Sequence, residues 1–359
     1  MNSKDFPLEY FYNETVTNIN IIFTTIASGI TILIAPFYFY ILLTQSKSLG
    51  SYRLFLLNHS IWTILFEISM SLTKPCFLMP AEVGTSAKSL KGNLYLLPGN
   101  KELLSVAGFV LGPLRKIGNS TMSCYFILID CLLAWFTIIG MTMTLVYRYT
   151  SIFPGKVKAI GTSKWMIVVS LAIQLCFSVG IFYITKEFFS LDHEAMMRKA
   201  IEFSPVLTQF ANEPTFVLMD KETLFSLHIT FCITILFISI LFIVLIVVLI
   251  SELKNHKYTS KNFELQKALI LSCIMQIGIT IIFLFLPCMV IFWSFTYYIA
   301  YTGPIAMVLG CIISLHAVFE MLATIYFVLP YRSFVGKKLS IFRKGKTNAV
   351  VVSVFSGKN

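Results

Sequence analysis

Charged residues are scarce in this sequence. They make up 13% of its 359 residues, while apolar residues make up 57%. A soluble domain is about a quarter charged and about half apolar. The shortage of charge therefore argues against an ordinary soluble protein and is typical of a chain surrounded by lipid.

Motifs that carry enzyme chemistry are also missing. The sequence has no GxSxG turn, no glycine-rich phosphate loop and no pair of carboxylates in one loop. His193-Glu194 has no second histidine four residues on, so the zinc-protease helix is absent. The eight cysteines show no CxxC or other metal spacing. We expect no enzyme, no metal site and no cofactor.

Seven apolar runs are present, each near the ~20 residues that span a bilayer as a helix. No run alternates with the period of a membrane strand. The sequence predicts an all-α membrane protein, a bundle of seven transmembrane helices. The predicted spans are Ile19–Thr44, Leu54–Met79, Thr121–Tyr147, Trp165–Thr185, Leu224–Ile250, Ala268–Trp293 and Pro304–Leu329.

Basic residues gather on one side of the predicted bundle. With the N-terminus outside, the inner loops and the tail hold 17 of the 28 Lys and Arg residues, against only Glu252 and Glu264. Cytoplasmic loops carry such an excess. The prediction is an extracellular N-terminus at 1–18, a seven-helix domain at 19–329 and a basic cytoplasmic tail at 330–359. The first run lacks a signal peptide's positive start and is expected to be retained.

The net charge of +11 belongs to this inner rim. We expect it to meet anionic membrane lipids and not nucleic acid. On the opposite side, Asn13-Glu14-Thr15 is a glycosylation sequon. The loop from Pro80 to Ser120 is long and partly apolar, which leaves the start of the third span poorly defined.

Five ionisable residues lie within the predicted spans, and each costs roughly 2.5–3.5 kcal/mol at a helix centre on insertion scales. Either they hold the helices together or they serve function. They are Glu67 and Lys74 in the second span, Asp130 in the third, and His316 and Glu320 in the seventh.

Two groups of candidate residues follow from these positions. His316 and Glu320 share one helix face, and we expect them to form a buried polar layer with Glu67. The candidate ligand-binding residues lie toward the outer ends of spans and are Lys74, Asp130, Trp293 and Tyr297. For Lys74, the alternative is that its amine reaches the outer surface.

Prolines and cysteines leave further alternatives open. Pro36, Pro75 and Pro287 interrupt predicted spans, and Pro287 is either a hinge or a static kink of the sixth span. Cys76 and Cys124 lie near outer span ends. They are either apolar packing residues or a disulfide pair.

Three stretches resemble the nematode serpentine chemoreceptors of class H, with class I of the same superfamily as the nearest rival. "YRLFLLNHSIWTILFEISMSLTKPCFLMP" is similar to their second span and "FELQKALILSCIMQIGITIIFLFLP" to their sixth. "SLHAVFEMLATIYFVLPYR" resembles their seventh, which ends in Pro-Tyr-Arg. The similarity extends more weakly over residues 20–335.

This resemblance implies a G-protein-coupled chemosensory receptor in the plasma membrane, in sensory neuron cilia. It would bind a small external odorant or soluble chemical and activate a heterotrimeric G protein. We expect the G-protein face to include Arg148, Lys254, Lys257, Lys261 and Arg332.

The chain departs from the family at the end of the third span. The family ends this span with Glu-Asn-Arg, whereas this chain has Val146-Tyr147-Arg148, so the acid is lost. If that acid restrains the arginine at rest, this receptor has higher basal activity or couples weakly.

A transporter that uses Glu67, Lys74 and Glu320 as an ion relay is the alternative function. A transporter of this size should show an internal repeat, and none is detectable between the first three and the last three runs.

Overall fold

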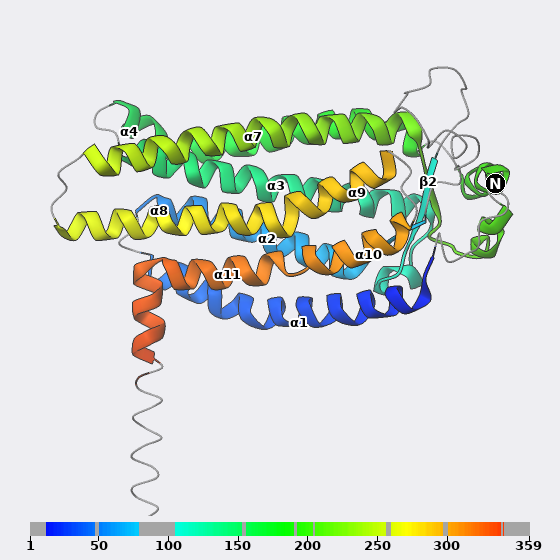
Figure 1. Ribbon diagram of the computed structural model, residues 1–359, viewed down its shortest axis with the longest axis horizontal. Helices are drawn as coiled ribbons and strands as arrows, with labels where there is room; N and C mark the ends of the chain where they lie inside the picture. Colours follow the sequence, from blue (N-terminus) through cyan, green and yellow to red (C-terminus); the bar gives the residue numbers. More distant parts are fainter. Residues whose placement is uncertain are drawn as a thin grey trace, which may run out of the picture.

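Long apolar helices dominate the computed structural model, which describes residues 12–46, 50–78, 105–152, 156–189, 192–203, 205–255, 260–296, 301–338 and 340. Within these residues, seven helical segments are long and apolar enough to cross a membrane, which confirms the predicted bundle (Figure 1). Leu33, Leu175 and Phe237 are 80%, 67% and 67% exposed on its outside. Such a surface requires lipid around it.

The first five spans are single helices, and the last two are each interrupted. The first five are α1 (Glu14–Thr44), α2 (Tyr52–Thr73), α3 (Ser120–Ile152), α5 (Trp165–Thr185) and α7 (Lys221–Asn255). The sixth comprises α8 (Ser260–Thr280), the π-helical turn η8 (Ile281–Phe285) and α9 (Leu286–Thr296), and the seventh comprises α10 (Thr302–Ile313) and α11 (His316–Phe327).

A small antiparallel sheet, which the sequence did not predict, lies at one end of the bundle. Its strands are β1 (Pro75–Leu78), β2 (Ser105–Val110) and β3 (Val217–Asp220), in the order β1-β2-β3. Cys76 pairs with Phe109, and Ala107 pairs with both Leu78 and Leu218. We call this the sheet end of the molecule, and the opposite end, where α11 finishes, the tail end (Figure 1).

The second span is shorter than predicted. It ends at Thr73, because Lys74 takes a left-handed backbone conformation with φ of 44° and Pro75 begins β1. The prediction that this span reaches Met79, with Pro75 inside it, was therefore wrong. The apolar loop ahead of the third span supplies β2, which pairs with β1.

Side chains from α6 (His193–Phe203) and the short helix η7 (Pro205–Phe210) pack on the sheet and close this end. Cys76 and Cys124 are buried in the same apolar cluster, and neither forms a disulfide. Burial raises the pKa of the Cys76 thiol, which keeps it protonated and unreactive. Of the two alternatives, both cysteines are therefore apolar packing residues and not a disulfide pair.

Proline has different effects in two of the spans. Pro36 lies inside the continuous helix α1. In the sixth span, η8 comes directly before Leu286-Pro287. Because proline lacks an N–H and its ring crowds the preceding turn, the wider turn relieves the strain that Pro287 introduces.

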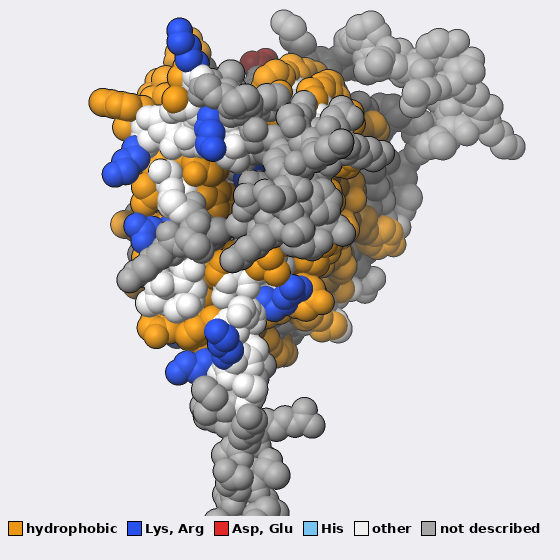
Figure 2. All heavy atoms as spheres, turned by 90° about the vertical axis from the view of Figure 1, so that its left-hand side faces the viewer, with side chains coloured by type: hydrophobic (Ala, Val, Ile, Leu, Met, Phe, Trp, Pro, Cys, Tyr) orange, Lys and Arg blue, Asp and Glu red, His pale blue; other side chains and the backbone are white. Residues whose placement is uncertain are grey.

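The tail end carries basic side chains. After α11 the chain turns at Val328, and residues 329–338 form a further helix that points away from the bundle (Figure 1). Pro330 lies in its first turn, where the missing N–H costs nothing. Figure 2 shows Lys and Arg side chains around this end, and the described exposed ones include Lys156, Lys158, Lys164, Arg332 and Lys338.

Gly112 tests how the sheet is attached to the bundle. Its N–H donates to Thr73 O at 2.9 Å, and a Cβ atom there would lie 2.0 Å from Leu72 O. We predict that Gly112→Ala lowers the thermal unfolding temperature of the purified protein, since overpacking costs about 1–3 kcal/mol. Gly278→Ala is the control, because nothing lies within 4 Å of a Cβ at that position. Equal melting temperatures for both variants would contradict this attachment.

Candidate functional site

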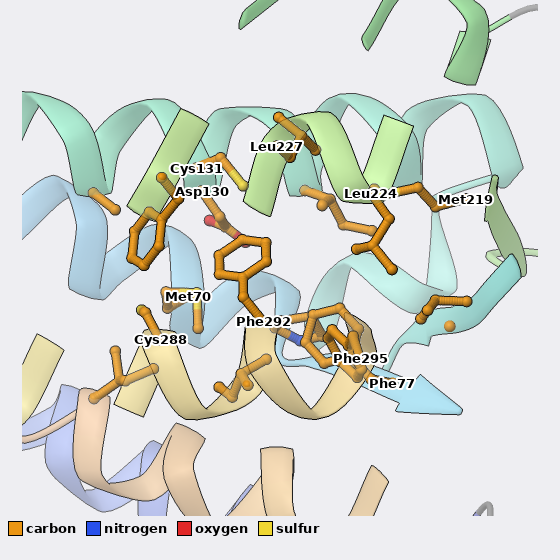
Figure 3. Close-up of a pocket in the computed structure, with 18 of the residues that line it drawn as sticks. Met70, Phe77, Asp130, Cys131, Met219, Leu224, Leu227, Cys288, Phe292 and Phe295 are labelled. Carbon is orange, nitrogen blue, oxygen red and sulfur yellow. The ribbon is translucent and has the colours of Figure 1, made fainter. Parts of the chain in front are cut away.

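A cavity of about 170 Å³ lies inside the bundle next to the sheet (Figure 3). Aromatic side chains from α2, α3, α7 and α9 form much of its wall, and they include Phe66, Trp135, Phe231 and Phe292. An apolar cavity of about 150 Å³ is enough to hold benzene. The space therefore suits a small, largely apolar molecule.

The sheet closes one end of this cavity. All three strands contribute lining residues, among them Phe77 from β1, Ala107 and Phe109 from β2, and Met219 from β3. The loops that carry these strands are far apart in the sequence, and the strand pairing brings them together over the cavity.

Asp130 on α3 is the single carboxylate among the described residues that line the cavity. Ser69 Oγ donates to Asp130 Oδ1 at 2.5 Å, and Thr73 Oγ1 donates to Oδ2 at 2.7 Å. Both donors come from the end of α2, and they fix the direction of the carboxyl group. The predicted ligand residue thus lies at a cavity, and its role in binding stays a prediction.

The other predicted ligand residues lie elsewhere. Lys74 Nζ donates to Ile21 O at 2.9 Å and to Thr25 Oγ1, and the side chain lines a separate cavity of about 50 Å³. Trp293 is 52% exposed on the outside of α9 and does not line the larger cavity. Tyr297 lies outside the described residues.

A buried polar network crosses the middle of the bundle, and Glu320 on α11 is its acid. Glu320 Oε1 lies 2.5 Å from His59 Nε2 on α2, and Thr63 Oγ1 donates to Oε2 at 3.0 Å. His316 Nε2 lies 4.0 Å from Oε2. The side chains of His59, His316 and Glu320 are at most 3% exposed.

Hydrogen bonding fixes the position of one proton of this pair. His59 Nδ1 lies 3.0 Å from Thr137 O on α3, and a carbonyl oxygen only accepts, so Nδ1 carries a proton. One further proton, on His59 Nε2 or on Glu320 Oε1, makes this 2.5 Å contact attractive, although its geometry is not that of a regular hydrogen bond. Whichever atom holds it, the pair has no net charge, which makes its burial tolerable.

The same reasoning applies to His316. Thr280 Oγ1 on α8 donates to Gln276 O at 3.0 Å and lies 3.2 Å from His316 Nε2, so His316 donates to Thr280. Gln276 Nε2 in turn donates to Thr324 Oγ1 on α11 at 2.9 Å. The network therefore joins α2, α3, α8 and α11, while His316 Nδ1 is buried without a partner.

Glu67 has a different partner from the one expected. Ser28 Oγ on α1 donates to Glu67 Oε1 at 3.0 Å, and Glu67 Oε2 is buried without a partner beside the smaller cavity. No hydrogen bond or ion pair among the described residues joins Glu67 to His316 or Glu320. The contacts of Glu320 on the second span are His59 and Thr63, which sequence reasoning missed.

At the tail end, Arg148 is buried and held by an aromatic ring. Its guanidinium lies 4.3 Å from the ring centre of Tyr52, and Nη2 donates to the Tyr52 hydroxyl. Nε and Nη1 have no hydrogen-bond partner. The described partner of this arginine is therefore an aromatic residue and not an acid.

The Pro-Tyr-Arg sequence has three separate roles at this end. Pro330 begins the terminal helix, Tyr331 is buried and Arg332 is exposed. Ser46 Oγ donates to Leu42 O and lies 2.5 Å from the Tyr331 hydroxyl, so Tyr331 donates to Ser46. Burial raises the pKa of Tyr331, which keeps this donor protonated.

The remaining predicted residues are only partly described. Lys257 lies outside the described residues, and the side chains of Lys254 and Lys261 are not described either. Asn13 caps α1, where its Oδ1 accepts from Val16 N at 3.0 Å. Glycosylation of Asn13 stays a prediction.

The Srh family of serpentine seven-transmembrane G-protein-coupled chemoreceptors matches residues 103–341 of the sequence. The chain belongs to this family. The match confirms the class H resemblance and covers α3 through α11. No curated protein matches the chain.

In this Srh receptor, one sequence signal could have found the missed partners of Glu320. His59, Thr63 and Glu67 are spaced four residues apart and so lie on one face of α2. That periodicity identifies a polar face. It does not say which neighbouring helix each side chain meets, and here the face divides between α11 and α1.

The network predicts that His59 and Glu320 are energetically coupled. His59→Phe or Glu320→Gln alone should destabilise the receptor by about 3–5 kcal/mol, the cost of breaking a buried pair. The double variant should cost less than the sum, because the second change breaks nothing further. Thermal unfolding in detergent measures this cycle.

Glu67 provides the control for this cycle. Since Glu67 contacts Ser28, Glu67→Gln and Glu320→Gln should add within about 0.5 kcal/mol. Additive effects for His59→Phe and Glu320→Gln would show that these two residues are not energetically coupled.

Proposed function

We propose that this chain is a G-protein-coupled chemosensory receptor in the plasma membrane of a sensory neuron. A small external chemical occupies the 170 Å³ cavity, and a heterotrimeric G protein is activated at the tail end. The observation that carries this proposal is the position of the cavity directly beside the polar network, on the same helices.

Cavity and network residues are at most one helical turn apart on four helices. Ile138 lines the cavity beside Thr137 on α3, and Leu284 lines it one turn from Thr280. The same holds for Phe66 and Thr63 on α2, and for Ile313 and His316 in the seventh span. A ligand that moves these walls also moves the hydrogen-bonded groups.

The free energy that a ligand can supply is large enough to rearrange the hydrogen bonds of this network. A hydrogen bond between membrane helices contributes about 0.6 kcal/mol on average. A ligand that favours one arrangement by about 1–3 kcal/mol can therefore redistribute several of them. The π-helical turn η8 lies between Thr280 and the cavity-lining segment of α9 and provides a place for the sixth span to bend.

The resting state is held at the tail end by Tyr52 and Arg148. Release of the arginine would expose a cation beside the exposed basic residues of this end, including Arg332. Lys254 near the end of α7 and Lys261 near the start of α8 belong to the same proposed face, together with Lys257, which lies between them in the sequence.

Charge supports an N-terminus outside and a tail inside. Among described exposed charged residues, those at the tail end are all basic, whereas the sheet end also has Glu14, Asp192, Glu194, Glu202 and Glu222. Cytoplasmic segments carry the excess of Lys and Arg. Epitope tags are placed on the two ends of the protein and probed with antibody on intact cells. The N-terminal tag alone should be accessible. An accessible C-terminal tag would reverse the topology.

The ion-relay alternative has no supporting contact in the described residues. Lys74 contacts α1, Glu67 contacts Ser28, and Glu320 contacts His59. Lys74 and Glu67 both border the smaller cavity, but no hydrogen bond or ion pair among the described residues links either of them to Glu320.

Filling the cavity tests the proposed ligand site. Ala134 lines it, and Ala134→Phe should abolish the calcium response of receptor-expressing cells to an active chemical found by screening. Ile129 is 43% exposed to lipid on the same helix, so Ile129→Phe is the matched control. The two variants are compared at equal amounts of receptor on the cell surface. An unchanged response in Ala134→Phe would contradict the site.

The aromatic restraint on Arg148 predicts a change in basal signalling. Tyr52→Phe removes the hydroxyl that accepts from Arg148 and leaves the ring in place. We expect basal signalling to rise several-fold in Tyr52→Phe, while Arg148→Ala lowers evoked signalling. Both are measured at matched surface level. A lower basal signal in Tyr52→Phe would mean that this contact supports the active state.

A further inference from the structure

The larger cavity offers a ligand very little polar chemistry. The described residues that line it include no Lys, Arg, His, Ser, Thr, Asn or Gln. A carboxylate, phosphate or sugar ligand would lose its hydrogen bonds to water and find few replacements, which is costly. The wall therefore selects against anionic and polyhydroxylated molecules.

Asp130 is the exception in this wall, and it still has capacity to accept hydrogen bonds. Each carboxylate oxygen has two acceptor sites. One site on each is occupied, by Ser69 and by Thr73. Both of these donors come from α2, whereas the carboxyl group also borders the cavity, where it lies near the ring of Phe292 (Figure 3).

The surroundings of Asp130 suit a cation. A positive group beside Asp130 would neutralise a carboxyl group that is only 6% exposed. Aromatic faces also attract cations within about 6 Å, and Phe292 and Trp135 belong to the same wall.

We propose that the cavity binds a small lipophilic amine, with its ammonium group on Asp130 and its apolar body among the aromatic side chains. The volume admits about one ring with a short chain. This inference rests on the proposed function, because it takes the cavity as the ligand site. It adds the chemical class of the ligand and the residue that selects it.

Three probes of nearly equal shape separate charge from size: benzylamine, benzyl alcohol and ethylbenzene. Each is titrated onto the purified receptor in nanodiscs at pH 7 by ligand-observed NMR, with empty nanodiscs subtracted. We expect benzylamine to bind about 10-fold to 100-fold more tightly than ethylbenzene, the range for a hydrogen bond between charged groups. Benzyl alcohol should fall between them.

Two variants assign the preference to Asp130. Asp130→Asn should remove the advantage of the amine and leave ethylbenzene binding within about twofold. Glu67→Gln changes a buried carboxyl group beside the smaller cavity, so the amine preference should persist in it. If Asp130→Asn does not reach the membrane, Thr73→Val removes one donor from the carboxylate and should alter amine binding alone.

The outcomes distinguish the two levels of the proposal. Equal binding of the three probes, all lost in Ala134→Phe, would keep the cavity and overturn the amine. An amine preference that persists in Asp130→Asn would overturn the role of Asp130. Failure of all three probes to bind would overturn the amine proposal. An active chemical that still acts on Ala134→Phe would overturn the cavity itself.

Discussion

The contact between Glu320 and His59 constrains the rest of this bundle. A carboxyl group in the centre of a membrane protein needs a partner that supplies a proton or a positive charge. Here the partner is on α2, and Thr137 O on α3 holds that partner's other nitrogen. The close approach of α2 to α3 at this level depends on Gly140, where a Cβ would lie 2.9 Å from the Cα of His59. Three helices are therefore fixed relative to one another at a single depth.

This depth divides the molecule into two parts with different chemistry. Toward the sheet end, the helices separate around an apolar cavity that three strands close. Toward the tail end, two tyrosines make the main polar contacts. The ring of Tyr52 lies against Arg148, and the hydroxyl of Tyr331, in the same apolar cluster, donates to Ser46. The sixth and seventh spans are interrupted near the network, at η8 and at Ser314-Leu315. In the proposed mechanism, a change in cavity shape is transmitted through the hydrogen bonds that join α8 and α11.

The helices could be predicted from sequence because a bilayer demands long apolar runs, and that demand is local. The sheet could not, because β1 and β3 are short and are separated by more than 130 residues, so no local pattern marks their pairing through β2. The buried acids were identified correctly as polar positions, but periodicity assigns a residue to a helix face and not to a partner. Glu67 therefore received the wrong neighbours in the expected layer, and His59 was overlooked. Asp130 could be selected from the sequence because its position toward the outer end of its span is a local property. The structure places it at the larger cavity.

Infrared difference spectroscopy of the purified receptor can show whether occupancy of the cavity alters the protonation or hydrogen bonding of the Glu320 carboxyl group. Spectra with and without an active chemical are compared, and Glu320→Gln assigns the carboxyl band. We expect the active chemical to shift or remove this band in the unaltered receptor and to leave it unchanged in Ala134→Phe. An unaltered receptor that signals in response to the chemical while the Glu320 band stays constant would contradict the proposed mechanism.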